Sequence, residues 1–140
     1  KTILLDGDEV REFLLSIKYK MGYRKIDRAK GAYPVSKMIN LLLSNNINVI
    51  YANVGLNKLA TKVWYKNFKN LIYVYVKTDV KDIINFGKKD LYKRIKKNDD
   101  GLDIKTDINK KADIIINNNF DKSIKVLSQQ MIKEINRIIS

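Results

Sequence analysis

Two carboxylates and an arginine lie close together near the start of the sequence. Asp6 and Asp8 are separated by a single glycine, and Arg11 follows three residues after Asp8. A carboxylate can accept a proton or hold a metal ion, and an arginine can neutralise an anionic substrate. The group is therefore typical of a metal-assisted transfer to or from an anion. The same residues also fit a plain turn in which an aspartate caps a helix.

The composition leaves few other groups for acid–base chemistry. The 140 residues contain no histidine and no cysteine, which excludes imidazole catalysis, thiolate metal sites and disulfides. The net charge of +13, from 28 Lys and Arg against 15 Asp and Glu, favours an anionic partner such as a nucleotide. Lys, Asn and Ile are all heavily used, as AT-rich genomes favour, so we give the charge alone little weight.

A strand, a turn and a helix are expected to position the two aspartates. The apolar run Ile3–Leu5, closed by Asp-Gly, indicates a buried strand that ends in a turn. Apolar residues from Val10 to Ile17 recur at spacings of three, four and seven, which predicts a helix from Asp8 onward. Ligands of open α/β sheets bind at such corners, and Gly7 would let the backbone turn tightly there.

Further helices and strands alternate along the rest of the chain. The predicted elements are a helix with Pro34 in its first turn that ends near Ser44, a strand over Ile47–Val54, a short helix that contains Leu59, Val63 and Trp64 and ends before Asn67, a strand over Leu71–Val76, a helix from Val80 to about Phe86, a basic helix over Lys89–Lys97, a mobile loop over Asn98–Lys111, a strand over Ala112–Ile116 and a helix from Asp121. This alternation predicts an α/β fold with a mostly parallel sheet covered by helices on both faces. No signal peptide or membrane span is found, so a cytoplasmic protein is expected.

Six segments, in this order and at this spacing, resemble the adenylylsulfate kinase family. They are Asp6–Arg11, Gly22-Tyr23 with Asp27-Arg28, the strand Asn48–Val54, the strand Ile72–Val76, Lys89–Tyr92 and Gly101–Asp103. The resemblance implies one three-layer P-loop kinase-like domain over residues 1–140. Its implied activity is transfer of the γ-phosphoryl group of ATP, with Mg²⁺, to a ribose 3′-hydroxyl of adenylylsulfate in sulfate assimilation. The implied partner is a nucleotide substrate; neither membrane nor nucleic acid is expected, and a homodimer is left open.

The resemblance also implies a role for individual residues. Asp8 would lie beside the accepting hydroxyl as its base or orienting group, and Asp6 would support the metal ion through water. Four residues would contact the acceptor nucleotide: Arg11 and Arg28 at its anionic part, Tyr23 stacked on its base, and Lys89 along its border. Residues 99–111 would belong to the lid over the site.

Three motifs of the family are replaced in this chain, and the replacements bear on the acceptor. Where the family follows its Asp-Arg with an Asn and an Arg that touch substrate, this chain has Gly31, Tyr33 and Pro34. The family's Ser-Pro becomes Gly55-Leu56, and its Arg-Asp becomes Phe86-Gly87. These changes leave open an acceptor other than adenylylsulfate, such as the cytidine diphosphoramidate of capsule synthesis.

A phosphate loop of the form G-x-x-x-x-G-K-[S/T] does not occur in the 140 residues. In this family the loop and its strand precede the Asp-Gly-Asp strand, and that first strand lies in the middle of the sheet. Two flanking strands would then lack a partner. We therefore expect a chain that is incomplete at its amino end, the alternative being a non-catalytic nucleotide-binding relic. A third interpretation, a basic nucleic-acid binder, rests on the net charge alone.

Overall fold

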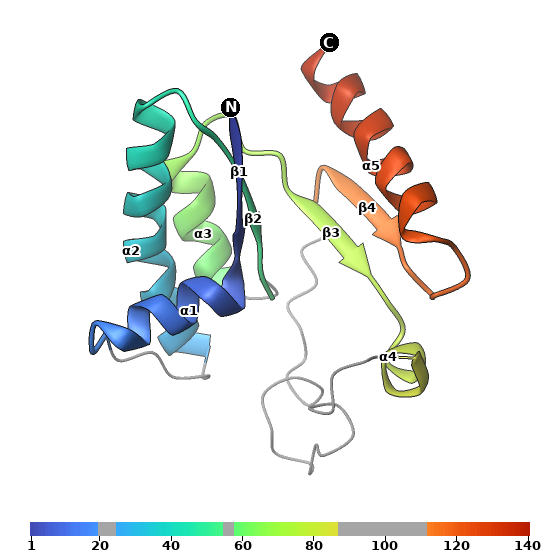
Figure 1. The fold of residues 1–140 in the computed structure, drawn as a ribbon, viewed down its shortest axis with the longest axis horizontal. Coiled ribbons are helices and arrows are strands. Elements are labelled where there is room, and N and C mark those ends of the chain that lie inside the picture. Colours follow the sequence, from blue (N-terminus) through green and yellow to red (C-terminus); the bar gives the residue numbers. More distant parts are fainter. Residues whose placement is uncertain (20–24, 55–57, 87–111) are drawn as a thin grey trace. The chain divides into compact units, whose positions relative to one another are not determined.

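The computed structural model describes residues 1–19, 25–54, 58–86 and 112–140. The helices and strands of these residues, labelled in Figure 1, are β1 (Thr2–Asp6), α1 (Gly7–Ser16), α2 (Lys25–Ser44), β2 (Asn48–Ala52), α3 (Lys58–Asn67), β3 (Val74–Lys77), α4 (Val80–Phe86), β4 (Ile114–Asn117) and α5 (Ile124–Ile139). They form two compact units, one from the described residues up to Leu71 and the other from those after it.

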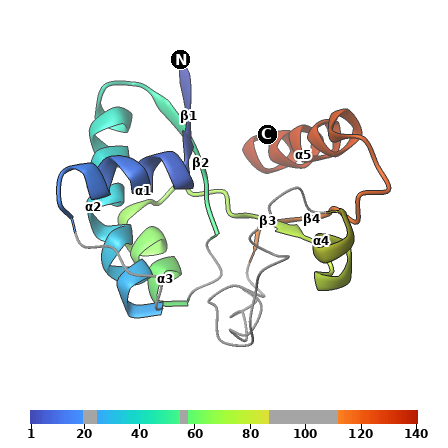
Figure 2. The same ribbon diagram turned by 60° about the horizontal axis from the view of Figure 1, so that its bottom comes forward.

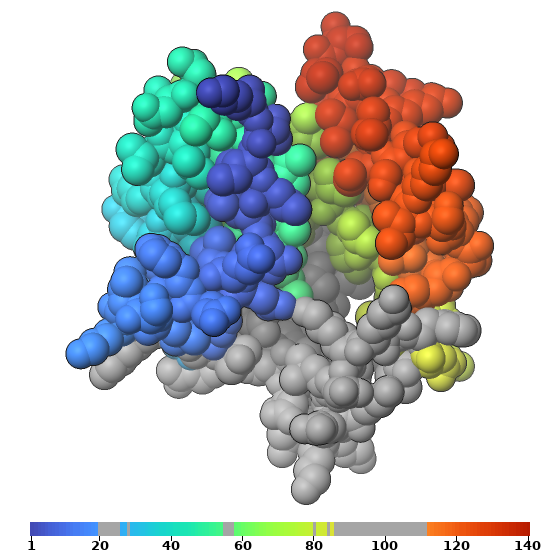
Figure 3. All heavy atoms as spheres, in the orientation of Figure 1, coloured from blue at the N-terminus to red at the C-terminus, as the bar shows by residue number. Residues whose placement is uncertain are grey.

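A parallel pair of strands forms the sheet of the first unit. β1 and β2 pair in register from Thr2 opposite Asn48 to Asp6 opposite Ala52. Helices α1, α2 and α3 lie on the same side of this pair in both ribbon views (Figures 1 and 2). The atoms of β1 and α1, in blue, are open on the face of the unit that Figure 3 shows.

The core of the first unit lies between the helices and one face of the strands. Its buried residues are Val10 and Leu14 of α1 and Val35 and Ile39 of α2. Partly buried side chains pack against them, including those of Leu5, Val49, Tyr51, Trp64 and Phe68. Because successive strand residues point to opposite faces, Leu4 and Ile50 lie on the other face, where they are 63% and 56% exposed.

Helix α2 begins well before the residue that the sequence predicts. It starts at Lys25, so Pro34 lies inside the helix rather than in its first turn. Proline cannot donate to the carbonyl of Lys30, at a cost of about 3 kcal/mol in a helix interior. The hydroxyl of Tyr19 donates to that carbonyl instead, at 3.4 Å. Burial of Val35 and Ile39 stabilises the helix by about 1.5–3 kcal/mol each, which is enough to offset the proline.

The second unit is built on another parallel pair. β3 and β4 pair from Val74 opposite Ile114 to Lys77 opposite Asn117. Ile114 and Ile116 are buried, and α5 packs on β4. Helix α5 begins three residues later than predicted because Ser123 caps it, accepting a hydrogen bond from the Val126 N–H at 3.4 Å.

The α/β class and the parallel pairing of the strands confirm the sequence prediction, while strand ends differ. β2 ends at Ala52 rather than Val54, because the partner strand ends at Asp6 and leaves no ladder beyond it. β3 begins at Val74 rather than Leu71, and β4 ends at Asn117, one residue later than predicted. Both ends follow from the pairing, which starts with Val74 opposite Ile114 and stops with Lys77 opposite Asn117. The helix expected over 89–97 and the loop over 98–111 lie outside the described residues.

Each strand of the described residues has one strand neighbour. The two sheets have the orders β1-β2 and β3-β4. Every strand therefore pairs along one edge, and its other edge meets no strand in the described part of the chain. None of the helices in that part is both long and apolar enough to span a membrane.

Candidate functional site

The Asp6-Gly7-Asp8 corner lies where β1 and β2 both end. Strand β1 closes at Asp6, helix α1 starts at the next residue, and Asp6 pairs with Ala52, the last residue of β2. This is the carboxyl edge of a parallel pair, the place where α/β sheets bind their ligands. The predicted strand-turn-helix corner is thereby confirmed. The strand itself is not buried as predicted: all residues of β1 except Leu5 are exposed, because the described helices of this unit cover one face of the strand pair.

Asp6 caps the helix that follows it. Its Oδ1 accepts a hydrogen bond from the backbone N–H of Asp8 at 2.8 Å, with Asp6 itself in an extended conformation. Asp8 and Glu9 fill the first turn of α1, where acidic side chains interact favourably with the helix dipole. The prediction that an aspartate of this turn caps the helix is therefore correct for Asp6. Both aspartates are also exposed to solvent.

Two substitutions of Asp6 separate the effect of its capping hydrogen bond from the effect of its negative charge. Asparagine caps a helix about as well as aspartate, whereas alanine does not. Asp6→Ala is expected to lower the free energy of unfolding by about 0.5–2 kcal/mol, and Asp6→Asn to change it by much less. Urea denaturation of both variants checks this. Equal losses of unfolding free energy in the two variants would contradict the cap. Any loss of activity in Asp6→Asn would show the effect of removing the negative charge.

Gly7 is required because a larger residue would not fit between the two strand ends. None of the described glycines has a positive φ, so the predicted need for a tight glycine turn does not hold. A Cβ placed on Gly7 would lie 2.8 Å from the Cβ of Asn53 and 3.0 Å from the carbonyl oxygen of Ala52. Glycine thus lets the end of β2 approach the corner closely, which brings Asn53 beside the two aspartates.

The structure places three of the six predicted site residues at this corner. Arg11 lies on α1, half-buried and three residues after Asp8, a spacing that puts both on the same side of a helix. Arg28 lies in α2, but its side chain is outside the described part of the chain. Tyr23 and Lys89 are also outside it.

An aromatic row supports the corner from the core side. Tyr51 lies opposite Leu5 in the sheet, and its ring meets Trp64 edge-on with centroids 5.5 Å apart. Trp64 in turn stacks on Phe68 at 6.2 Å. Burial, and secondarily the negative charge of Asp6, raises the pKa of the Tyr51 hydroxyl. Sequence analysis counted Tyr51 only as a strand residue, because its partners come from distant elements.

The raised pKa of Tyr51 predicts a loss of stability in alkali. The folded protein keeps this proton where the unfolded chain releases it, so the contribution to stability is present below pH ~10 and is lost as pH rises through the folded-state pKa. We expect the melting temperature of Tyr51→Phe to fall less steeply above pH ~10 than that of the unaltered protein. Tyr75→Phe, in the other unit, is the control; equal slopes in all three proteins would contradict the assignment.

The carboxylates of the corner suit one metal ion of a particular kind. Within the described residues, no group of three or more acidic side chains could hold a metal ion. Mg²⁺ bound with a nucleotide needs only one or two protein carboxylates, since phosphate oxygens and water complete its shell. Two exposed aspartates therefore fit Mg²⁺ bound together with a nucleotide.

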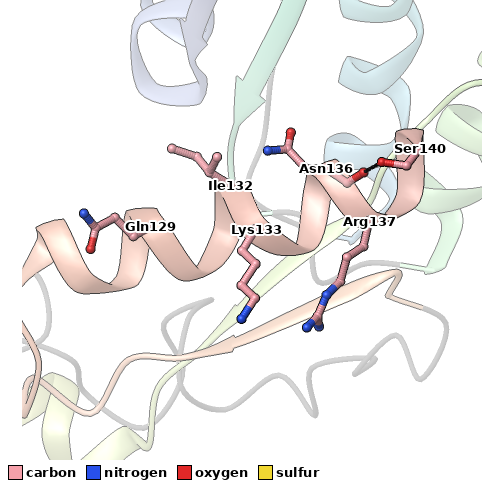
Figure 4. A pocket seen from close by; sticks show the side chains of 6 residues that line it. All are labelled: Gln129, Ile132, Lys133, Asn136, Arg137 and Ser140. Carbon is pink, nitrogen blue, oxygen red and sulfur yellow. Dashed lines mark hydrogen bonds between the residues drawn. The ribbon is translucent and has the colours of Figure 1, made fainter.

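A hollow lies along α5 in the second unit. Its lining residues are Gln129, Ile132, Lys133, Asn136, Arg137 and Ser140 (Figure 4). Arg137 is paired with Glu134 at 2.8 Å, and the Ser140 hydroxyl donates to the Asn136 carbonyl at 2.6 Å. A single helix supplies all of the described lining, so no second wall faces these groups and we assign them no ligand.

A solved structure and a family model, both of kinases, match this chain. The solved structure of the Mycobacterium tuberculosis APS kinase CysC in complex with AMPPNP and APS is similar, with a TM-score of 0.77 and 24% identity, over 95% of this chain and 79% of that one. The model of the family described as "Adenylylsulphate kinase" matches residues 1–117. The chain belongs to the adenylylsulphate kinase family, as its motifs predict.

A curated relative with a different acceptor in its name is also similar. The cytidine diphosphoramidate kinase of Campylobacter jejuni subsp. jejuni serotype O:2 is 30% identical over 137 residues, which are 95% of this chain and 78% of that protein. The family membership supports a nucleotide kinase. The acceptor, the roles of individual residues, a homodimer and a part in sulfate assimilation stay predictions.

Proposed function

We propose that this protein is a kinase that transfers the γ-phosphoryl group of ATP to a ribose 3′-hydroxyl of a nucleotide. The observation that carries the proposal is the exposed Asp6-Gly7-Asp8 corner with Arg11, at the carboxyl edge of a parallel strand pair in a chain of this family. Phosphoryl transfer depends mainly on positioning and charge neutralisation, which Asp, Arg and Lys supply without histidine or cysteine.

The preferred acceptor, in this proposal, is cytidine diphosphoramidate or a close analogue rather than adenylylsulfate. Two observations support this choice. The chain is 30% identical to a cytidine diphosphoramidate kinase. It also has Gly31, Tyr33 and Pro34 where the adenylylsulfate kinase pattern has an Asn and an Arg that touch substrate. Adenylylsulfate is the second candidate acceptor.

Each site residue has one role in the proposed reaction. The hydroxyl oxygen attacks the γ-phosphorus, the bond to the β–γ bridging oxygen breaks, and ADP leaves with that bonding pair. Asp8 orients the hydroxyl and takes its proton. The cationic and aromatic residues hold the acceptor: Arg11, Arg28 and Lys89 at its anionic part and Tyr23 on its base.

ATP and Mg²⁺ complete the proposal, and we place the reaction in the cytoplasm. When bound, Mg²⁺ neutralises the charge of the transferred phosphoryl group. Asp6 would support it through water, while its Oδ1 caps α1. The 140 residues carry no phosphate loop, so no residue of this sequence is proposed to cradle the phosphates of ATP.

An acceptor-dependent assay tests the function. The full-length protein is incubated with MgATP and either cytidine diphosphoramidate or adenylylsulfate, and ADP release and the phosphorylated product are measured. We expect a value of kcat/KM that is higher for cytidine diphosphoramidate. A higher value for adenylylsulfate would reverse the acceptor choice, and no acceptor-dependent ADP release with either would overturn the kinase.

Nucleotide binding without catalysis is the second candidate function, favoured by the lack of a phosphate loop within these 140 residues. Calorimetric titration of the same protein separates it from the kinase. Binding of the acceptor without any affinity for ATP, together with no turnover, would support this candidate.

A further inference from the structure

We propose that Asn53 is an acceptor-binding residue of this site, whose side-chain amide hydrogen-bonds the ribose hydroxyl next to the one that reacts. The inference rests on the proposed kinase function and adds a residue to which the sequence analysis gives no role of its own. It is drawn from the way β2 ends beside the Asp6-Gly7-Asp8 corner.

The position of Asn53 follows from the register of the strands. β2 ends at Ala52, opposite Asp6, so Asn53 is the first residue beyond the carboxyl edge of the pair. A Cβ on Gly7 would lie 2.8 Å from the Cβ and 3.1 Å from the Cα of Asn53. The Asn53 side chain therefore starts against Gly7, the residue that joins Asp6 to Asp8.

The Asn53 amide has no hydrogen-bond partner among the described residues, unlike the amides of two other asparagines. The amides of Asn45 and Asn67 donate to carbonyls four residues earlier, at 2.8 and 2.7 Å, and so serve the ends of their helices. Asn53 is exposed and makes no hydrogen bond with any residue that the structure describes. Its amide is thus not engaged in holding that part of the fold.

The chemistry of an amide suits a sugar hydroxyl at this place. An asparagine offers two donors and an acceptor, and a hydroxyl both donates and accepts. Because the amide is neutral, it neither repels an anionic acceptor nor competes with the aspartates for a cation. If Asp8 faces the reacting 3′-hydroxyl, the group beside it on the ribose is the 2′-hydroxyl, and Asn53 lies beside the same corner.

A matched pair of variants tests this role in the full-length protein. Asn53→Ala removes the amide beyond the carboxyl end of β2, and Asn48→Ala removes the same group from the exposed first residue of the same strand. Steady-state kinetics are measured with MgATP and with cytidine diphosphoramidate or its 2′-deoxy analogue. Melting temperatures are measured for every variant.

We expect Asn53→Ala to raise the KM for the acceptor about tenfold, the effect of one lost hydrogen bond. The KM for ATP and the melting temperature should stay unchanged, and the preference for the ribo- over the 2′-deoxy acceptor should disappear. Asn53→Asp, which keeps the shape but adds a negative charge, should raise the acceptor KM further. Asn48→Ala should behave like the unaltered protein.

The outcomes distinguish this inference from the function on which it rests. Turnover by the unaltered protein, with Asn53→Ala indistinguishable from Asn48→Ala, would overturn the role of Asn53 and leave the kinase in place. A preference for the ribo-acceptor that persists in Asn53→Ala would also overturn it. The absence of acceptor-dependent turnover in the unaltered protein would overturn the kinase and, with it, this role.

Discussion

Replacing Asp8 by asparagine is expected to lower kcat by about 10²–10⁴-fold while the protein stays folded. Asp8 is exposed at the start of α1, where its backbone N–H bonds the capping oxygen of Asp6. Asparagine keeps that backbone bond and nearly the same side-chain shape, so the change removes only the carboxylate that would take the proton. Single-turnover and steady-state rates with MgATP and the acceptor measure the effect, and circular dichroism reports the fold.

The control for Asp8→Asn is Glu9→Gln. Glu9 is the next residue of the same first turn and is also exposed, so its substitution removes an equal charge from the start of the helix. We expect the activity of Glu9→Gln to remain within a few-fold of normal. Near-normal kcat in Asp8→Asn, or equal losses in both variants, would contradict the role given to Asp8.

Placing alanine at Gly7 is expected to disturb both stability and activity. The added Cβ would meet a Cβ at 2.8 Å, a carbonyl oxygen at 3.0 Å and a Cα at 3.1 Å, and none of these atoms belongs to the flexible end of a side chain. The two strand ends must therefore separate. Such overpacking costs about 1–3 kcal/mol of unfolding free energy. Denaturant unfolding and kcat/KM of Gly7→Ala measure the two effects.

A second substitution shows whether the Gly7 contact is the cause. Asn53→Gly removes the atom at 2.8 Å but leaves the backbone contacts, so in combination with Gly7→Ala it should recover part of the stability. Glu9→Ala, in the same helix turn, is the control for a new alanine there. Unchanged stability in Gly7→Ala would show that β2 does not approach the corner as closely as described.

Local patterns of the sequence predict the fold class and the corner. The apolar run before Asp6 and the helical spacing after Asp8 are short-range signals, and both elements form where they are expected. Pro34 misled the prediction of α2, because a proline is typical of a first turn while the burial of Val35 and Ile39 depends on tertiary packing. Strand ends were missed for a similar reason, since a strand ends where its partner does.

The residues of the candidate site can likewise be divided into those that a local motif brings together and one that only tertiary structure brings close. Asp6, Asp8 and Arg11 are neighbours in the sequence, so a motif can bring them together. Asn53 is a neighbour of Gly7 only through the register of β1 and β2, which no short pattern shows. The cap formed by Asp6 can likewise be predicted from the sequence, because Asp-Gly is a common turn. How closely the end of β2 approaches this corner can be seen only in the structure.

The edges of β2 and β3 that meet no strand in the described part of the chain bear on its behaviour in solution. An edge without a strand neighbour presents a row of N–H and C=O groups, a template for any extended segment that meets it. Ile50 and Val76, on these two strands, are 56% and 54% exposed and would favour such an encounter. Unless those edges are covered, growing concentration should therefore drive these 140 residues toward strand exchange between copies and aggregation, so solubility depends on what pairs with the edges.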